Sequence, residues 1–85
     1  MNEKIIYKWG PLSSEPSPIR GGVVHVGWQD GNVFVWTANQ IVPGLRHPER
    51  MVKLHPTGQE YTGVCLGSVV APSGLVWHVI EEDGS

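Results

Sequence analysis

Residues 21–38, GGVVHVGWQDGNVFVWTA, contain two apolar runs of strand periodicity that meet at the dipeptide Asp30-Gly31. Asp-Gly suits a two-residue type I′ turn, in which both central residues take positive φ and the turn matches the right-handed twist of the flanking strands. The stretch therefore predicts a β-hairpin in which Gln29 faces Asn32. This hairpin is the element around which the rest of the chain is expected to fold.

Large apolar side chains lie on both faces of the predicted hairpin. The register places Val24, Val26 and Trp28 on one face, opposite Thr37, Val35 and Val33, and it places Val23, His25 and Gly27 on the other, opposite Ala38, Trp36 and Phe34. A sheet with one face in water alternates apolar with polar residues. We therefore expect both faces to be covered, by a second sheet, by closure of a barrel or by another subunit.

The length of 85 residues indicates a single small domain spanning residues 1–85. The only cysteine is Cys65, so no disulfide can form within the chain. No cluster of Cys and His has the spacing of a structural zinc site. We therefore expect core packing, together with contacts between subunits, to stabilise the fold, and we expect no cofactor and no metal.

The chain is mildly acidic, with six Lys and Arg against eight Asp and Glu and a net charge of -2. An acidic tail at residues 81–85 begins with Glu81-Glu82-Asp83. Non-specific binding to nucleic acid needs a basic face, so we expect none. The N-terminus has no apolar signal-peptide core, and no run approaches the roughly 20 apolar residues of a membrane span. We therefore expect no membrane contact and a cytoplasmic location.

Four further segments have the composition and periodicity of strands: residues 4–9, 50–55, 61–70 and 75–80. Residues 10–18 hold three prolines and are expected to form an exposed connection. Residues 39–49 are expected to form a loop with at most one short helical turn. A turn at residues 71–74 places Val70 opposite Leu75. The chain therefore predicts an all-β fold of about six antiparallel strands, in a small sandwich or a partly open barrel.

The histidines are the first candidates for a reactive site. His25 and His78 lie in predicted strands beside tryptophans, and the two rings could meet to share a metal or a proton. The interpretation we favour is that each is a core or interface residue, because no Cys or close His completes a metal set. His47 and His55 each precede a proline and suggest solvated loop residues. Cys65 could pair with His78 as a nucleophile, but a small core residue is the better interpretation. We expect no enzyme.

The aromatic residues are the better indication of function. A domain this small cannot fully bury four tryptophans in one core, so some should line a surface. The alternative is that they only wall the core. A surface of this kind could be a subunit contact, a partner interface or a stacking floor for a nucleotide base. The candidate binding surface comprises Trp9, Trp28, Trp36, Trp77, His25, His78, Tyr61, Arg46 and Arg50, and Arg20 joins the two arginines as a possible clamp for an anion.

Several short segments in their order along the chain resemble a family of small β-rich accessory proteins of tailed phages and prophages. These segments are Tyr7-Lys8-Trp9, Val35-Trp36, Thr57-Gly58, Leu66-Gly67-Ser68 and Leu75-Val76-Trp77-His78-Val79. The resemblance spans nearly the whole chain, except that residues 43–49 depart from the pattern of the family. It implies a phage accessory protein acting in the cytoplasm of a bacterial host, and it assigns no functional residue.

Our first hypothesis is a non-enzymatic phage or prophage binding protein that antagonises a host defence or regulatory system by occupying a surface of a host protein or protein complex. An alternative is an oligomeric sponge that sequesters a nucleotide signalling molecule in an aromatic and arginine-lined pocket. A third is a virion or assembly component. We also expect a homo-oligomer, because the hairpin is apolar on both faces and edge strands need cover.

Overall fold

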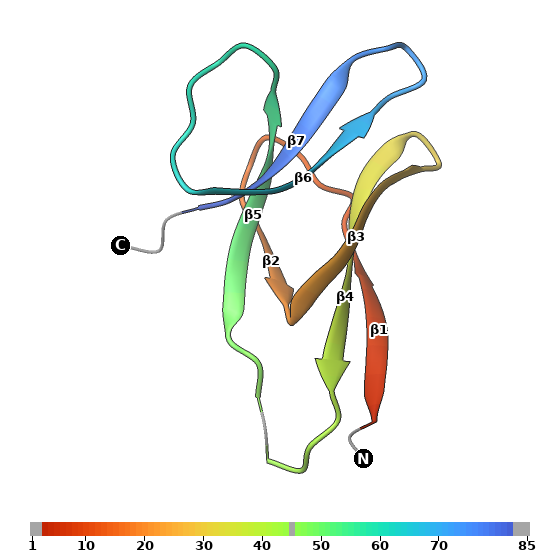
Figure 1. The fold of residues 1–85 in the computed structure, drawn as a ribbon, viewed down its shortest axis with the longest axis vertical. Helices are drawn as coiled ribbons and strands as arrows, with labels where there is room; N and C mark the ends of the chain where they lie inside the picture. Colours follow the sequence, from red (N-terminus) through yellow and green to blue (C-terminus); the bar gives the residue numbers. More distant parts are fainter. Residues whose placement is uncertain (1–2, 45, 83–85) are drawn as a thin grey trace.

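The computed structural model describes residues 3–44 and 46–82, which form seven β-strands in two antiparallel sheets (Figure 1). The strands are β1 (Lys4–Trp9), β2 (Ser17–Arg20), β3 (Gly22–Gln29), β4 (Asn32–Gln40), β5 (Glu49–Pro56), β6 (Val64–Val70) and β7 (Val76–Glu81). The first sheet has the order β1-β4-β3 and the second has the order β2-β5-β7-β6. The predicted all-β fold is confirmed as two sheets that do not close into a barrel. These residues include no helix, and hence none that could span a membrane.

The β3–β4 hairpin turns at Asp30-Gly31, whose φ angles of 52° and 83° are both positive, as predicted. Its register follows the prediction from Gln29 as far back as His25, which pairs with Trp36. Beyond that point the prediction is wrong, because the register shifts between Val23 and His25. Such a β-bulge adds one unpaired residue to one strand. As a result Val23 pairs with Thr37, not with Ala38.

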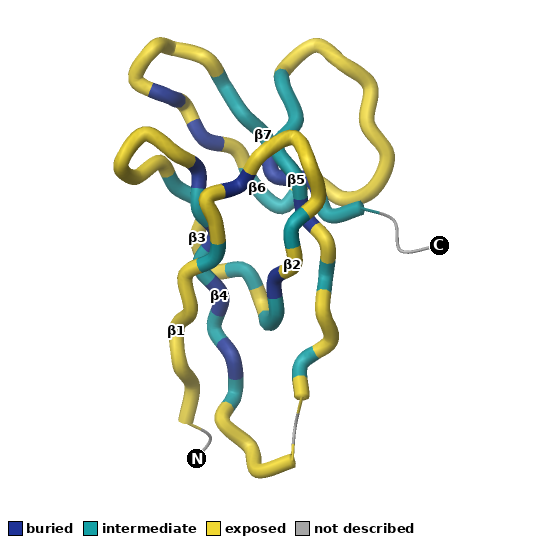
Figure 2. Tube along the Cα trace, turned by 180° about the vertical axis from the view of Figure 1, so that it is seen from behind, coloured by how far each residue is buried: buried dark blue, intermediate teal, exposed yellow. Residues whose placement is uncertain are grey.

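The core is one layer of side chains between the two sheets. Its buried members are Leu12, Ile19, Val33, Val35, Val52, Val69 and Val79. Figure 2 shows how β4 contributes to this core. Buried residues alternate with half-buried ones along the strand, because successive side chains point to opposite faces of a sheet. Trp9 and Trp77 are half-buried at the margin of this core. The molecule measures 42 × 31 × 18 Å.

The strand β2 corrects the prediction that residues 10–18 form an exposed connection. It pairs with β5, and Pro18 is tolerated there because β2 is an edge strand that needs few of its backbone donors. Leu12, earlier in the same segment, is buried, and its N–H donates to the carbonyl of Val33 at 2.9 Å. The segment therefore contributes to the core as well as connecting two strands.

The chain passes from the second sheet to the first at a single residue, Gly21, which forms the sharp corner between β2 and β3 (Figure 1). Its φ of 101° favours glycine, and a Cβ there would overlap Oδ1 of Asn39. Arg50 of β5 donates from Nη1 to the carbonyl of Gly21 at 2.8 Å. The corner between β2 and β3 therefore contacts β4 through Asn39 and β5 through Arg50.

The β6–β7 hairpin lies one residue away from its predicted register. Val70 pairs with Val76, because Ala71 N–H donates to the carbonyl of Leu75 at 2.8 Å and makes those two residues the last pair before the turn. In consequence Ser68, not Gly67, lies opposite His78.

The acidic tail is shorter than the sequence suggests. Glu81 belongs to β7 and pairs with Arg50 at 2.8 Å, and Glu82 pairs with Lys53 at 3.1 Å. The remaining tail residues, 83–85, lie outside the described residues. The first acids of the predicted tail are therefore held by ion pairs on β5.

Candidate functional site

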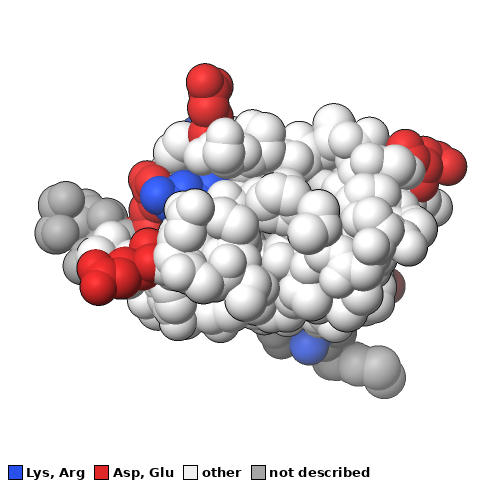
Figure 3. Space-filling model, turned by 90° about the horizontal axis from the view of Figure 1, so that it is seen from above, with Lys and Arg blue, Asp and Glu red and all other residues white. Residues whose placement is uncertain are grey.

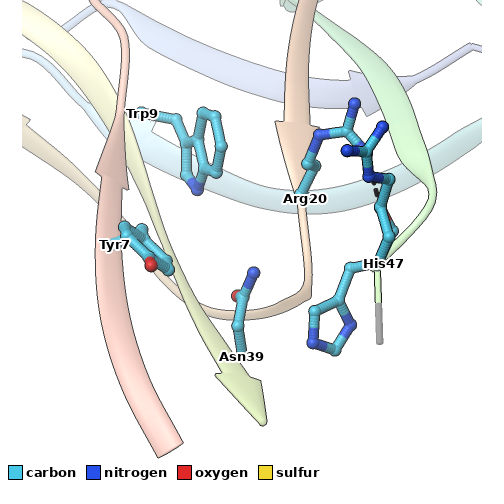
Figure 4. A pocket seen from close by; sticks show the side chains of 6 residues that line it. Tyr7, Trp9, Arg20, Asn39 and His47 are labelled. Carbon is cyan, nitrogen blue, oxygen red and sulfur yellow. Dashed lines mark hydrogen bonds between the residues drawn. The ribbon is translucent and has the colours of Figure 1, made fainter. Parts of the chain in front are cut away.

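A pocket of about 510 Å³ lies between the two sheets, at the end of the molecule where β1, β4 and β2 meet the connection to β5 (Figure 4). We call it the inter-sheet pocket. Its lining residues are Tyr7, Trp9, Arg20, Asn39, Arg46 and His47. A volume of this size falls within the range of about 300–1,000 Å³ that is typical of small-molecule sites.

Tyr7 and Trp9 form the aromatic wall of the pocket. They are two residues apart on β1, so their side chains point to the same face of the sheet. The ring centroids are 6.1 Å apart and the planes are tilted by 54°. The indole Nε1–H of Trp9 donates to Oγ1 of the buried Thr37 at 2.8 Å, which fixes the orientation of Trp9. Tyr7 remains 44% exposed.

Asn39 lies between Tyr7 and His47 in Figure 4, with its amide nitrogen directed toward the space beside Trp9. It occupies the inward position of β4 that follows Val35 and Thr37 in the strand alternation, and it is only 7% exposed. Its Oδ1 is buried against Gly21 and has no hydrogen-bond partner among the described residues. An unpaired buried polar group costs about 1–3 kcal/mol, so most buried polar atoms in native proteins have a partner in the protein, a water or a ligand.

Two arginines give the pocket its charge. Arg20 donates from Nη1 to the carbonyl of His47 at 2.6 Å, and it makes a loose ion pair with Glu49 at 3.5 Å. Arg46 is exposed and follows the first residues of the β4–β5 connection. The imidazole Nε2 of His47 lies 3.3 Å from the carbonyl of Gln40, and it must be the donor because a carbonyl only accepts. No lining residue carries a carboxylate, so the pocket attracts anions.

A second candidate surface lies on the outward face of the first sheet. We call it the aromatic face and define it by Lys8, His25, Phe34 and Trp36. The Trp36 ring lies 6.2 Å from Phe34 and 5.2 Å from His25, and Lys8 Nζ lies 4.2 Å above the Phe34 ring. Lys8 also donates a hydrogen bond to Gln29. The three rings therefore form a continuous row, and the Lys8 ammonium lies over two of them, Phe34 and Trp36.

Gly27 leaves the space that the His25 and Trp36 rings occupy on this face. A Cβ at this position would come within 2.7 Å of His25 Nε2 and 3.3 Å of the Trp36 ring, so only glycine leaves the space that these rings use. The alternation along β1 adds Lys4 and Ile6 to the same face, and Ile6 is 57% exposed. The outward positions of these paired strands carry lysine and no carboxylate. The face is therefore apolar and positively charged, although the chain as a whole is acidic.

At the end of the molecule that Figure 3 shows, the charges do not gather into a further surface. Figure 3 shows the end of the molecule that carries most of the strand turns, with its few charged side chains at the margin and uncharged residues across the middle. Among residues 3–44 and 46–82, no group of three or more His, Cys, Asp or Glu side chains could hold a metal ion.

His25 and His78 belong to separate networks. His25 packs on Trp36 in the first sheet, whereas His78 lies in the second sheet, within 2.6 Å of Ser68 Oγ and 2.8 Å of Thr57 Oγ1. The histidine directly opposite His78 in the β5–β7 pair is His55. The structure therefore does not bring together the two histidines that the sequence suggested could meet.

A hollow of about 320 Å³ beside His78 includes Tyr61 and Cys65. Tyr61 is 51% exposed in the loop before β6, which begins at Val64 and not at residue 61. Cys65 is exposed, so its interpretation as a core residue is wrong. The register shift between Cys65 and Gly67 is the physical reason, because a bulge changes the face to which the flanking side chains point.

The remaining residues of the predicted binding surface are Trp28, Trp77 and Arg50. Trp28 is 37% exposed near the hairpin turn, and Trp77 packs against the core. Arg50 donates to both carboxylate oxygens of Glu81, at 2.9 and 2.8 Å. Hydrogen bonding from Arg50 lowers the pKa of Glu81, and hydrogen bonding from Glu81 raises the pKa of Arg50. Arg50 therefore holds β7 and the Gly21 corner.

Sequence reasoning found part of each candidate surface. Trp9 and Arg46 lie in the inter-sheet pocket, with Arg20 as the further arginine, and His25 and Trp36 lie on the aromatic face. Asn39 was not among the residues selected from the sequence. Its position two residues after Thr37 in β4 was a usable signal, because side chains two residues apart in a strand point to the same face. His47 lines the pocket half-buried, which corrects its interpretation as a solvated loop residue.

Comparison of the chain with protein-family models, with curated proteins and with solved structures gave no match. The proposals below therefore rest on the residues of this chain alone.

Proposed function

We propose that this chain is a non-enzymatic binding protein of the phage accessory kind, which holds a host protein against the aromatic face. The observation that carries the proposal is the row of Phe34, Trp36 and His25 rings, which stands on the outward side of the sheet under Lys8. The core lies on the opposite side of the same sheet. The rings of this row therefore add little to the buried core.

The chemistry of the aromatic face indicates the kind of partner. Tryptophan is enriched at the energetic centres of protein interfaces, where a large ring is desolvated within a rim of polar groups. Lys4 and Lys8 supply positive charge beside the rings, and no carboxylate opposes them on this face. A partner with an apolar patch bordered by Asp and Glu would match both properties, and its charge would speed the encounter.

The tilted rings favour a protein over a stack of bases. The planes of neighbouring rings differ by 51° and 56°, so they do not form one flat floor. Lys8 also occupies the open side of the Phe34 ring. Side chains of a protein partner can fill such an uneven surface, whereas successive bases stack on parallel faces. Occupying a functional surface of a host protein in this way would antagonise that protein without any chemical step.

Affinity capture from host lysate, followed by binding measurements on the recovered protein, tests the proposal. The wild-type chain is expected to retain an acidic host protein, and Trp36→Ala and Lys8→Glu are each expected to weaken its binding by at least about tenfold. Leu75→Ala is the matched control, because Leu75 is 60% exposed in the turn of the other sheet.

The salt dependence of binding to the host protein is a second test of the proposal. Binding of wild type is expected to weaken as salt is raised, and Lys8→Glu is expected to remove most of that dependence. A captured protein that binds wild type, Trp36→Ala and Lys8→Glu equally well would overturn the assignment to this face. Equal losses in Leu75→Ala would do the same.

A further inference from the structure

We propose that the inter-sheet pocket is a second binding site, separate from the aromatic face, and that it takes a nucleoside phosphate. In this assignment the phosphate lies against Arg20 and Arg46, and the base lies against Tyr7 and Trp9. The carboxamide of Asn39 lies between these two halves of the pocket and bonds to the nucleoside.

The cationic half of the pocket has the chemistry of a phosphate site. Arginine presents a planar set of donors that matches phosphate oxygens in pairs. Arg20 is partly held by the carbonyl of His47 at 2.6 Å, which positions its guanidinium at the pocket wall. Its contact to Glu49 is long, at 3.5 Å, and both side chains are partly exposed, so a phosphate can compete with that carboxylate.

The aromatic half of the pocket suits a planar ring. Trp9 is fixed by its hydrogen bond to Thr37, so the indole presents a prearranged wall, and Tyr7 closes the side at 6.1 Å between centroids. Stacking on such side chains tolerates any base because every base has a π face. A phosphate without a base would leave this wall unused, so the pocket favours an anion that carries a ring.

Asn39 gives an independent reason to expect a ligand. It is more than nine-tenths buried, its Oδ1 has no partner among the described residues, and its amide nitrogen is directed into the pocket in Figure 4. The amide nitrogen is a hydrogen-bond donor, which an acceptor on the edge of a base or a ribose hydroxyl can satisfy. A purely apolar ligand could not do so.

The pocket and the aromatic face can be tested separately because they use opposite sides of β1. Tyr7 and Trp9 point toward the second sheet, whereas Lys8 and Lys4 point away from it. A change on one side removes no side chain from the other. Failure of nucleotide binding would therefore leave the proposed protein partner unaffected, and the reverse also holds.

Isothermal titration of the purified full chain tests the proposal. The probes are the ribonucleoside monophosphates, a cyclic dinucleotide, adenosine and inorganic phosphate. We expect saturable binding of at least one nucleotide, and we expect adenosine and inorganic phosphate each to bind at least about tenfold more weakly than that nucleotide. The melting temperature should rise with the concentration of the same nucleotide.

Variants locate the site. Arg46→Ala and Tyr7→Ala change exposed side chains and are each expected to weaken nucleotide binding by about tenfold while the chain stays folded. Lys4→Ala is the matched control, since it removes one positive charge from the outward side of the same strand as Tyr7. It is expected to leave the affinity unchanged, and circular dichroism confirms folding of each variant.

Three results would overturn the assignment. The first is the lack of saturable binding by every nucleotide in the panel. The second is inorganic phosphate binding as tightly as the best nucleotide, which would remove the role of the aromatic wall. The third is an equal loss of affinity in Lys4→Ala and Arg46→Ala, which would show that only the net charge of the chain matters.

Discussion

Gly21 is the residue on which the change of sheet depends. It is the only residue between β2 and β3, its φ of 101° is unfavourable for other residue types, and its Cα lies directly against the carboxamide of Asn39. Its neighbour Gly22 lacks the positive φ, and a Cβ at that position would have nothing within 4 Å. The fold therefore requires glycine at position 21 and not at position 22, although the sequence alone does not distinguish the two residues.

We expect Gly21→Ala to lower the free energy of unfolding by about 2 kcal/mol or more, because it adds backbone strain and a clash with Asn39. Gly22→Ala should change the same quantity by less than about 0.5 kcal/mol. Urea denaturation of both variants measures the difference. Equal stability of the two variants would contradict the role given to Gly21.

Among the single residues of the candidate sites, the sequence predicted the aromatic and cationic ones better than the uncharged polar ones. Trp9 was found because tryptophan is conspicuous, and Arg46 because a guanidinium suits an anion. Arg50 was placed in the same set, yet it serves Glu81 and Gly21, since the sequence does not reveal which arginine has a partner within the chain. Asn39 is identified as buried only when the alternation of β4 is followed to its end.

The ion pair between Arg50 and Glu81 connects neighbouring strands. It joins β5 to β7, and the same guanidinium reaches the corner between β2 and β3. The pKa of Glu81 is lower in the folded chain than its ordinary value because Arg50 donates hydrogen bonds to the carboxylate. A carboxylate with a lowered folded-state pKa adds stability above its unfolded-state pKa, and that contribution is lost as pH falls through the folded-state pKa.

We therefore expect Glu81→Gln to be less stable than wild type at pH 7, by about 1 kcal/mol. The difference should shrink as the pH is lowered from about 5, because wild type then loses the same interaction. Thermal unfolding across this pH range measures it. Glu60→Gln, in an exposed loop, is the control and should follow wild type at every pH. A constant gap between Glu81→Gln and wild type would contradict this account.

Elements with strong local signals were predicted well. The Asp30-Gly31 turn fixed the register of the central hairpin, because few residue pairs accept two positive φ angles. The bulge near Val24 was not predicted, since nothing local separates an inward Val23 from an inward Val24. β2 was missed because Pro18 argues against a strand, and only its position at the edge of a sheet makes the strand possible.

At the scale of the molecule, residues 3–44 and 46–82 provide the predicted cover for one face of the hairpin and not for the other. The second sheet packs on the inward face, and the aromatic face lies on the other side. The homo-oligomer that the sequence suggests stays a prediction. On the aromatic face, Ile6 is the exposed apolar side chain that a second copy would bury, at 57% exposure.

Sedimentation tests that prediction. When the proposed host protein, which would compete for the same face, is absent, we expect a dimer at tens of micromolar chain. We expect Ile6→Lys to weaken this dimer by at least about tenfold, since a third lysine would then join Lys4 and Lys8 on the buried face. Val70→Lys, at a position 65% exposed on the second sheet, is the control. A monomer at every concentration would contradict the homo-oligomer and would leave the aromatic face free for a different protein.

The single layer of core side chains has a consequence for how the molecule comes apart. Each sheet covers the inward face of the other, and the chain changes sheet three times, after β1, after β2 and after β4. Separating the sheets would expose the inward apolar face of both to water at once. We therefore expect the two sheets to unfold together in one cooperative transition, as small single domains usually do.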